Sequence, residues 1–256
     1  MHKPNDATVA LREGIFEYAR KRLEYDPAPL DAPQTFEFLT QHAGPTVTED
    51  GLGGLKSLKL FETVLAPATI STDHPGYLSF IPCAPTEAAK LFDLVVSASA
   101  IYGGSWMEGA GAVYAENEVL AWLAKEAGLP ESAGGVFVQG GTLGNLSALV
   151  AARHRAAQAL KAQGKARPET WKFICSAEAH SSLKAAASVM DVEIIKAEVG
   201  EDGRLRGPAV QAALEAAGEG VFAIVATGGT TNFGIVDRLD EIGQIAADNN
   251  IWFHVD

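Results

Sequence analysis

The stretch GGVFVQGGTLGNLSALVAA, residues 134–152, decides the fold. Its first half contains a short run of β-branched and aromatic residues at 136–138, which predicts a buried strand. Its second half repeats apolar residues at the three-to-four spacing of a packed helix, at Leu143, Leu146, Leu149 and Val150. The sequence therefore predicts a strand that leads directly into a helix.

Between these two predicted elements lies the turn Gly140-Gly141-Thr142. Two glycines allow a sharp turn and a close approach of the backbone to a ligand, and Thr142 is a competent helix N-cap. The first amide N–H groups of such a helix point outward at the positive end of its dipole, which suits a phosphate. A tight turn without a ligand fits the same residues, because glycine-rich turns recur in α/β folds.

The composition of the whole chain is that of a soluble globular protein. With 256 residues, 47% of them hydrophobic and 20% charged, it can form one large domain or two small ones with a sizeable core. The net charge of −12 would repel nucleic acid and anionic membranes, so we expect neither as a partner. Backbone amides can still bind a phosphate in such a chain.

The cysteine count and the apolar runs bear on the compartment. Cys83 and Cys175 cannot form a disulfide framework, which indicates a reduced compartment. The N-terminus does not resemble a signal peptide, and no apolar run is long enough to span a bilayer. We therefore expect a cytoplasmic protein. The sequence also contains no CxxC or HExxH pattern, so we expect no metal site.

Toward the N-terminus, proline-rich breaks separate three predicted helices, at residues 6–25, 35–42 and 55–65. Helices this short do not form a core of their own. We therefore interpret residues 1–73 as a helical arm that packs on a second subunit, with packing along its own domain as the alternative. Residues 74–256 are then the main domain.

Within the main domain, helices are predicted at 86–100, 111–127 and 142–163, and strands then alternate with helices. The predicted strands cover 171–175, 192–197, 221–226 and 251–255, and the predicted helices between them cover 181–190, 208–217 and 237–247, the last capped by Asp237. This alternation predicts a three-layer α/β fold, with a mainly parallel sheet covered by helices on both faces.

Polar residues follow the predicted strands, at the sheet edge where ligands of such folds bind. His180 follows 171–175, a Gly-Gly-Thr-Thr loop ending at Thr231 follows 221–226, and Asp256 follows 251–255. Each also has a plain structural interpretation, as a surface or capping histidine, a turn-capping threonine or a helix cap. Together with the glycine turn, they predict a site for one flat phosphorylated ligand.

Four segments carry a family resemblance: GGVFVQGGTLGNLSALVAAR, SAEAHSSLKAA, VATGGTTNFGIVDRLDEIGQIA and IWFHVD. In this order they resemble the group II pyridoxal-phosphate-dependent decarboxylases, the family of the aromatic amino acid and glutamate decarboxylases. The resemblance covers about residues 74–256. It implies a fold-type I enzyme with pyridoxal 5'-phosphate as cofactor, a small-molecule L-amino acid as substrate, and a homodimer in which the arm wraps the partner subunit.

The resemblance also implies which residues bind the cofactor. Gly140, Gly141 and Thr142 match the phosphate-binding turn. His180 matches the histidine that stacks over the cofactor ring, and Thr231 matches the second threonine of a loop near the cofactor and the substrate carboxylate.

Asp256 matches the aspartate that pairs with the pyridinium nitrogen of the cofactor. A carboxylate there keeps the nitrogen protonated, which makes the ring a strong electron sink. His180 and Asp256 are therefore the candidate catalytic residues. His254, on the same strand face as Asp256, is either a support for that carboxylate or a plain packed histidine.

The sequence departs from the family pattern at its end. The family's Schiff-base lysine lies downstream of the His-Val-Asp motif, and the sequence ends at Asp256. No lysine present occupies that position, and Lys184 is expected on the helix after His180. We therefore expect a partial enzyme, truncated or completed elsewhere, that lacks the family's small C-terminal domain and is inactive alone.

The substrate is less well defined by the resemblance. The residues that match substrate-pocket positions are Phe80, Ile81, Pro82 and Trp106. However, Gly104 stands where aromatic amino acid decarboxylases carry a bulky aromatic residue, and residues 143–144 replace the common Glu-Ala. Aromatic, acidic, diamino and phosphorylated amino compounds all remain candidate substrates.

Three other functions are compatible with parts of the sequence. A carbon–carbon lyase resembling the sphingosine phosphate lyases is the nearest, because those enzymes share much of the motif set. A nicotinamide-dependent oxidoreductase would need a GxGxxG turn, which residues 140–144 lack. A non-catalytic binding or dimerisation module is the third.

Overall fold

The computed structural model describes residues 3–80 and 83–256. The chain divides into two compact units, Met1–Gly109 and Ala110–Asp256, and each is described by itself. The predicted boundary between arm and main domain at residue 73 stays a prediction. Among the described residues, no helix is both long and apolar enough to cross a membrane.

The first unit is helical and confirms the helices predicted there. It contains α1 (Asp6–Leu23), α2 (Phe36–Ala43), α3 (Gly54–Leu60), which continues as the π-helical turn η1 (Phe61–Leu65), and α4 (Glu87–Ser99). Side-chain oxygens cap three of these helices: the amide oxygen of Asn5 accepts from the N–H of Thr8 at 2.9 Å, and Thr35 and Thr86 cap α2 and α4. The caps explain why each helix begins where it does, since they satisfy amides that have no intrahelical partner.

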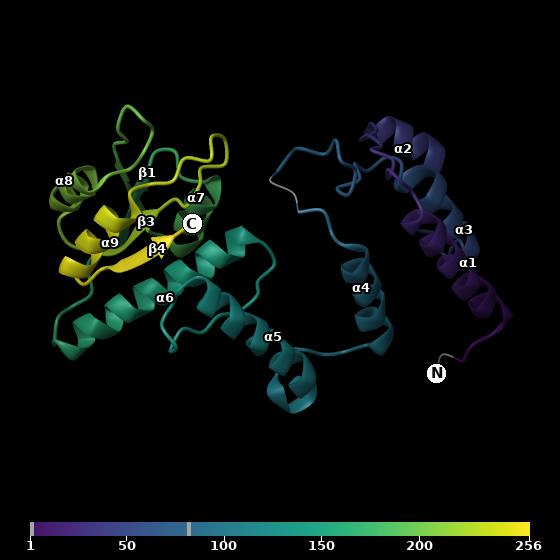
Figure 1. Ribbon diagram of the computed structural model, residues 1–256, viewed down its shortest axis with the longest axis horizontal. Coiled ribbons are helices and arrows are strands. Elements are labelled where there is room, and N and C mark those ends of the chain that lie inside the picture. Colours follow the sequence, from purple (N-terminus) through teal and green to yellow (C-terminus); the bar gives the residue numbers. More distant parts are fainter. Residues whose placement is uncertain (1–2, 81–82) are drawn as a thin grey trace. The chain divides into compact units, whose positions relative to one another are not determined.

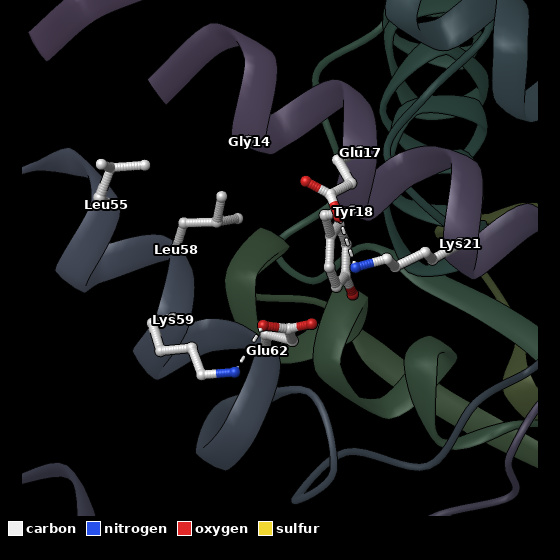
Figure 2. A pocket seen from close by; sticks show the side chains of 8 residues that line it. All are labelled: Gly14, Glu17, Tyr18, Lys21, Leu55, Leu58, Lys59 and Glu62. Carbon is white, nitrogen blue, oxygen red and sulfur yellow. Dashed lines mark hydrogen bonds and ion pairs between the residues drawn. The ribbon is translucent and has the colours of Figure 1, made fainter. Parts of the chain in front are cut away.

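Helices α1 and α3 pack side by side (Figure 2). Gly54 makes the close approach, since a Cβ there would lie 2.5 Å from the Leu11 side chain. Tyr18 of α1 and Phe61 of η1 meet edge to face with ring centroids 5.8 Å apart. These contacts hold the N-terminal helices together within their own unit.

Asp73 links three segments of the first unit. Its carboxylate accepts hydrogen bonds from Arg22 of α1 at 2.8 Å and from Lys90 of α4 at 3.0 Å. The side chain of Asp73 is only 15% exposed, so solvent screens these ion pairs less than surface pairs. The bond from Arg22 is the main reason that the pKa of the Asp73 carboxyl falls from 3.8 to about 2.

We expect Asp73 to make the stability of the first unit depend on pH in the acid range. Because its pKa is lower in the folded chain, its contribution is fully present above the unfolded value of 3.8 and is lost as the pH falls toward 2. Asp73→Asn should remove about 1–2 kcal/mol of the free energy of unfolding at pH 7. It should also flatten the pH dependence between 4 and 2. Urea unfolding at a series of pH values measures both, and equal pH dependence in the two proteins would contradict the prediction.

The second unit is the α/β part of the chain (Figure 1, teal through green to yellow). After α5 (Trp106–Glu126), which is kinked at Gly109, come the elements α6 (Gly141–Ala162), β1 (Lys172–Ser176), α7 (Ser181–Met190), β2 (Glu193–Ala197), α8 (Gly207–Ala217), β3 (Val221–Ala226), α9 (Leu239–Asp248) and β4 (Trp252–Val255). Their bounds lie close to those predicted from the sequence.

The four strands form one sheet in the order β2-β1-β3-β4, and all neighbours are parallel. Side chains that alternate along β1 bury into two separate cores. Phe173 and Cys175 pack with α6 and α7, while Ile174 packs with α8 and α9. Burial raises the pKa of the Cys175 thiol to about 12. The predicted three-layer fold is confirmed.

One predicted strand is wrong. Residues 136–138 form no strand, and Val136 and Phe137 are 66% and 55% exposed. Within residues 3–80 and 83–256 no strand pairs with them, and a strand forms only where its N–H and C=O groups find partners. The Phe137 N–H instead donates to Glu116 Oε1 of α5 at 3.0 Å.

The predicted cap of α9 is also wrong. Asp237 is buried, and the residue that caps α9 is Arg238, without a side-chain bond. The two carboxylate oxygens of Asp237 accept from the N–H groups of Leu205 at 2.8 Å and Thr227 at 2.7 Å. The side chain therefore accepts from two loop amides and not from the helix terminus. Both amides are buried, and a buried N–H group without an acceptor costs more free energy than one that water can reach.

Candidate active site

A pocket of about 270 Å³ lies at the carboxyl ends of β1, β3 and β4, where the sequence predicts a ligand site. Its walls come from the segments that follow these strands and from the start of α6. The lining residues are Gly141, Thr142, Asn145, His180, Ser182, Thr227, Gly229, Thr231 and Asp256. The structure thus brings together Gly141 and Thr142 of the glycine turn, His180, Thr231 and Asp256.

The glycine turn differs from the prediction in one respect. Gly140, with φ +90°, is the cap of α6 and is not part of the pocket lining, while Thr142 lies in the first helical turn and is not the N-cap. The Gly140 carbonyl accepts from the N–H groups of Leu143 and Gly144. The amides of Gly141 and Thr142 precede the first intrahelical bonds, so they are available to a ligand at the pocket wall.

His180 caps α7 at the edge of the pocket. Its Nδ1 accepts from the backbone N–H of Ser182 at 3.2 Å and lies 2.9 Å from the Ser182 hydroxyl. A nitrogen that accepts from a backbone N–H carries no proton, so these bonds assign the ring proton to Nε2. The capping interpretation of His180 and its place in the pocket are therefore both correct.

Asp256 is held by a residue that the sequence analysis missed. The amide nitrogen of Asn145 donates to Asp256 Oδ1 and to Ser182 Oγ, both at 2.9 Å. The Asn145 oxygen lies 2.7 Å from Nε2 of His254. His254 thus reaches Asp256 through Asn145. Desolvation by burial lowers the pKa of His254, and the negative charge of Asp256 opposes this shift only in part.

The sequence contained a signal for Asn145. It lies on the same face of α6 as the buried Leu149 and Ala152, four and seven residues later, and is itself only 5% exposed. A polar residue on an otherwise apolar stripe needs hydrogen-bond partners inside the protein, which is a reason to expect a network there.

The two threonines after β3 have different environments. The Oγ1 of Thr230, which is buried, accepts from the N–H of Ile235 at 3.1 Å and so closes its own loop. Thr231 is exposed and lines the pocket. The turn-capping role considered for this pair belongs to Thr230, which leaves Thr231 free for a ligand.

The predicted substrate residues belong to the other unit or are not described. Phe80 and Trp106 lie in the first unit with side chains that are 91% and 61% exposed, and their role at a substrate pocket stays a prediction. Ile81 and Pro82 lie outside the described residues.

The first unit has a hollow of its own, of about 200 Å³, between α1 and α3 (Figure 2). Its charged groups pair with each other: Lys21 with Glu17 at 2.7 Å, and Lys59 with Glu62 at 3.0 Å. Because these charges are exposed and mutually neutralised, we assign no ligand to it. Within residues 3–80 and 83–256, no cluster of three or more histidine, cysteine or acidic side chains could hold a metal ion.

Comparison with known proteins identifies the family. The pyridoxal-dependent decarboxylase conserved domain matches residues 54–256, which is most of the chain. This chain belongs to the pyridoxal-dependent decarboxylase family. The family resemblance of the four sequence motifs is thereby confirmed.

Two curated members of the family show how the chain relates to it. L-2,4-diaminobutyrate decarboxylase of Rhizobium meliloti (strain 1021) is 35% identical over 189 residues, which cover 72% of this chain and 37% of that protein. Tryptophan decarboxylase 2 of Oryza sativa subsp. japonica is 34% identical over 206 residues, which cover 75% and 41%. The chain thus spans less than half the length of either relative.

Solved structures of other proteins share the fold. The crystal structure of mouse CSAD has a TM-score of 0.86 and 24% identity, covering 98% of this chain and 55% of that one. The glutamate decarboxylase domain of a Vibrio parahaemolyticus protein has a TM-score of 0.82 and 24% identity, covering 100% and 59%. The fold is therefore that of the solved pyridoxal-dependent decarboxylases, as predicted.

The pocket of this family member fits a pyridoxal phosphate group in its chemistry. At Gly141 an added Cβ would meet no atom within 4 Å, so the space beside the free amides at the start of α6 is open to a phosphate. Asp256 supplies a carboxylate and His180 a flat ring, both in the lining of the same pocket. The pocket volume lies just below the usual range of roughly 300–1,000 Å³ for small-molecule sites.

Proposed function

We propose that the full-length protein decarboxylates an L-amino acid and uses pyridoxal 5'-phosphate as its cofactor. The observation that carries this proposal is the convergence of an anion-binding helix start, an imidazole and a carboxylate in one pocket at the carboxyl edge of the sheet. Family membership supports it, because the matched domain is that of the pyridoxal-dependent decarboxylases.

We assign the phosphate to the start of α6. The amides of Gly141 and Thr142 and the Thr142 hydroxyl can donate to phosphate oxygens at the positive end of a 22-residue helix. This explains how a chain with a net charge of −12 can hold an anion without a basic patch. Thr231 lines the same pocket, and we assign its hydroxyl to a further oxygen of the cofactor or to the substrate carboxylate.

We assign the ring to His180 and Asp256. Asp256 holds a proton on the pyridine nitrogen, because an adjacent carboxylate favours the cationic form of that nitrogen. His180, fixed as the cap of α7, limits the tilt of the ring that it contacts. When bound, pyridoxal phosphate supplies an electron sink for the charge left when CO2 departs. These roles of His180 and Asp256 are those that the sequence motifs predict.

An assay of CO2 release by the full-length protein with pyridoxal 5'-phosphate tests the proposal. The relatives named for L-2,4-diaminobutyrate and tryptophan suggest these two amino acids as first substrates, with L-glutamate as an acidic one. We expect equal amounts of CO2 and amine from at least one of them. Release of an aldehyde from a phosphorylated amino alcohol, without CO2, would favour a carbon–carbon lyase instead.

We also propose that the protein is a cytoplasmic homodimer. The free thiol of the exposed Cys83 suits a reducing compartment.

For the dimer, α4 presents a run of large apolar side chains to solvent: Leu91, Phe92, Leu94, Val95 and Val96, which are 41–65% exposed. An apolar surface this concentrated is unusual for a monomer, so we infer that a second copy covers it.

We expect Val95→Glu on α4 to shift the full-length protein from dimer to monomer. A buried, unpaired carboxylate in the interface should weaken the dimer by at least about tenfold. Sedimentation velocity at a series of protein concentrations measures this change. Val189→Glu, at an exposed valine of α7, is the matched control and should leave the dimer unchanged. A Val95→Glu protein that dimerises like the control would contradict the use of α4 as the interface.

A further inference from the structure

We propose that Asn145 is a positioning residue that holds the carboxylate of Asp256 and the ring of His180 in a fixed relation, and that His254 orients Asn145. This proposal rests on the proposed function, since it assigns a purpose to residues in and next to the lining of the proposed cofactor pocket. It names two side chains, Asn145 and His254, that the family motifs did not assign to catalysis.

The orientation of the Asn145 amide follows from its partners. The Asp256 carboxylate can only accept, so the Asn145 atom 2.9 Å from it must be the nitrogen. The second hydrogen of that nitrogen goes to Ser182 Oγ, also at 2.9 Å. The amide oxygen is then the only acceptor left, and it faces His254 Nε2 at 2.7 Å. Both donors and the acceptor of Asn145 are in use.

These bonds show which ring nitrogen of His254 carries the proton. Because the Asn145 oxygen accepts, Nε2 of His254 must donate and carries the proton. Burial lowers the pKa of this imidazole, so the ring is neutral near pH 7 and binds Asn145 as a single tautomer. His254 therefore orients Asn145 by a directed hydrogen bond and adds no second charge beside Asp256.

The hydrogen-bond network continues from His254 to His180, and each side chain in it donates to the next. His254 donates to Asn145, Asn145 donates to Ser182, and the Ser182 hydroxyl is left to donate to Nδ1 of His180 at 2.9 Å. Hydrogen bonds aligned in this way strengthen one another in a low-dielectric interior. A branch from the same Asn145 nitrogen reaches Asp256. Asn145 thus contacts Asp256 directly and reaches His180 through Ser182, which connects the two proposed ring-contacting residues.

Burial makes the network rigid. Asn145 and Ser182 are 5% and 3% exposed, so water does not compete for their bonds. They also lie on different helices, α6 and α7, which pack against the same face of the sheet. The buried bond between Asn145 and Ser182 therefore links the position of Asp256 at the end of β4 to that of His180 at the start of α7.

The experiment compares Asn145→Leu with the wild-type full-length protein. Leucine has a similar shape and cannot hydrogen-bond, while Gln158→Leu, at an exposed position of the same helix, is the matched control. With cofactor bound, we expect Asn145→Leu to lower kcat by about 10- to 100-fold while KM changes by less than about threefold. Gln158→Leu should leave both unchanged. An Asn145→Leu enzyme with the kcat of the control would overturn the proposal.

A second measurement needs no activity. Nitrogen-15 NMR of the histidine side chains should show His254 with its proton fixed on Nε2 in the wild type and as a mixture of tautomers in Asn145→Leu. A separate kinetic comparison tests the role of His254. His254→Gln, which keeps a donor for the Asn145 oxygen, should retain more of the kcat than His254→Leu. An unchanged His254 tautomer in Asn145→Leu would overturn the network.

The two proposals can fail separately. If the wild-type protein binds pyridoxal 5'-phosphate but releases no CO2 from any amino acid, the proposed function is wrong. The tautomer of His254 and the effect of Asn145→Leu on cofactor affinity, measured by the absorbance of the bound cofactor, still decide whether Asn145 positions Asp256. Equal cofactor affinity in both proteins, with an unchanged tautomer, would overturn the positioning role alone.

Discussion

Asp256→Asn should lower the kcat for decarboxylation by about 10²-fold or more, the usual effect of removing one preorganised electrostatic partner. The substitution keeps the shape of the side chain, and its oxygen can still accept from Asn145 as Oδ1 of Asp256 does at 2.9 Å. The amide nitrogen then occupies the second position, where it donates instead of accepting. A donor there cannot hold a proton on the pyridine nitrogen, so the electron sink is weakened.

Steady-state kinetics and the absorbance of bound cofactor check this prediction. The backbone bonds of residue 256, from its N–H to Ala226 and from Gly228 to its carbonyl, are unaffected by the change, so the fold should be retained. Asp248→Asn, at an exposed position of α9, is the control. If Asp256 only terminates β4, Asp256→Asn will lose stability but keep its kcat within about threefold of the control, and our assignment is then wrong.

Asp237→Ala should cost about 3–5 kcal/mol of the free energy of unfolding. The change removes the only side-chain acceptor of two buried amides, those of Leu205 and Thr227, at 2.8 and 2.7 Å. All three residues are less than 5% exposed, so water cannot replace the lost bonds. Because Thr227 also lines the pocket, we expect weaker cofactor binding as well.

Urea unfolding of the full-length protein measures this loss as a lower midpoint at unchanged slope. Asp237→Asn should lose less, since one oxygen remains to accept while the amide nitrogen faces a second donor. Asp248→Ala removes an exposed carboxylate that accepts only from Gln244, and should change stability by less than about 0.5 kcal/mol. Equal effects of Asp237→Ala and Asp248→Ala would show that Asp237 is not needed.

Much of the fold followed from periodicity alone. The strands β1 to β4 and the helices between them lie close to their predicted bounds, because they carry clear apolar patterns separated by polar or glycine-containing turns. The strand predicted at residues 136–138 failed because the pattern cannot show whether a partner strand exists. The same apolar run fits an exposed connection equally well.

The site residues that belong to a sequence motif could be predicted, and those whose role depends on helix packing could not. His180, Thr231 and Asp256 follow strand ends, and the topology of a parallel sheet places such residues together. Asn145 and Ser182 were missed because their role depends on which helices pack together. The sequence predicts a helix cap at Asp237 because an aspartate before a helix usually is one, whereas its burial and its bonds to Leu205 and Thr227 depend on the tertiary fold.

The parallel strand order has a consequence for how the site forms. Each pairing joins strands that are separated by at least one helix, and β4, which carries Asp256 at its end, follows the other three strands of this sheet along the chain. Such non-local pairing is slow, since loop-closure entropy is lost before contacts are gained. The pocket is therefore complete only after β1, β3 and β4 have paired. A ligand that binds this pocket therefore raises the free energy of unfolding of the second unit as a whole, by mass action.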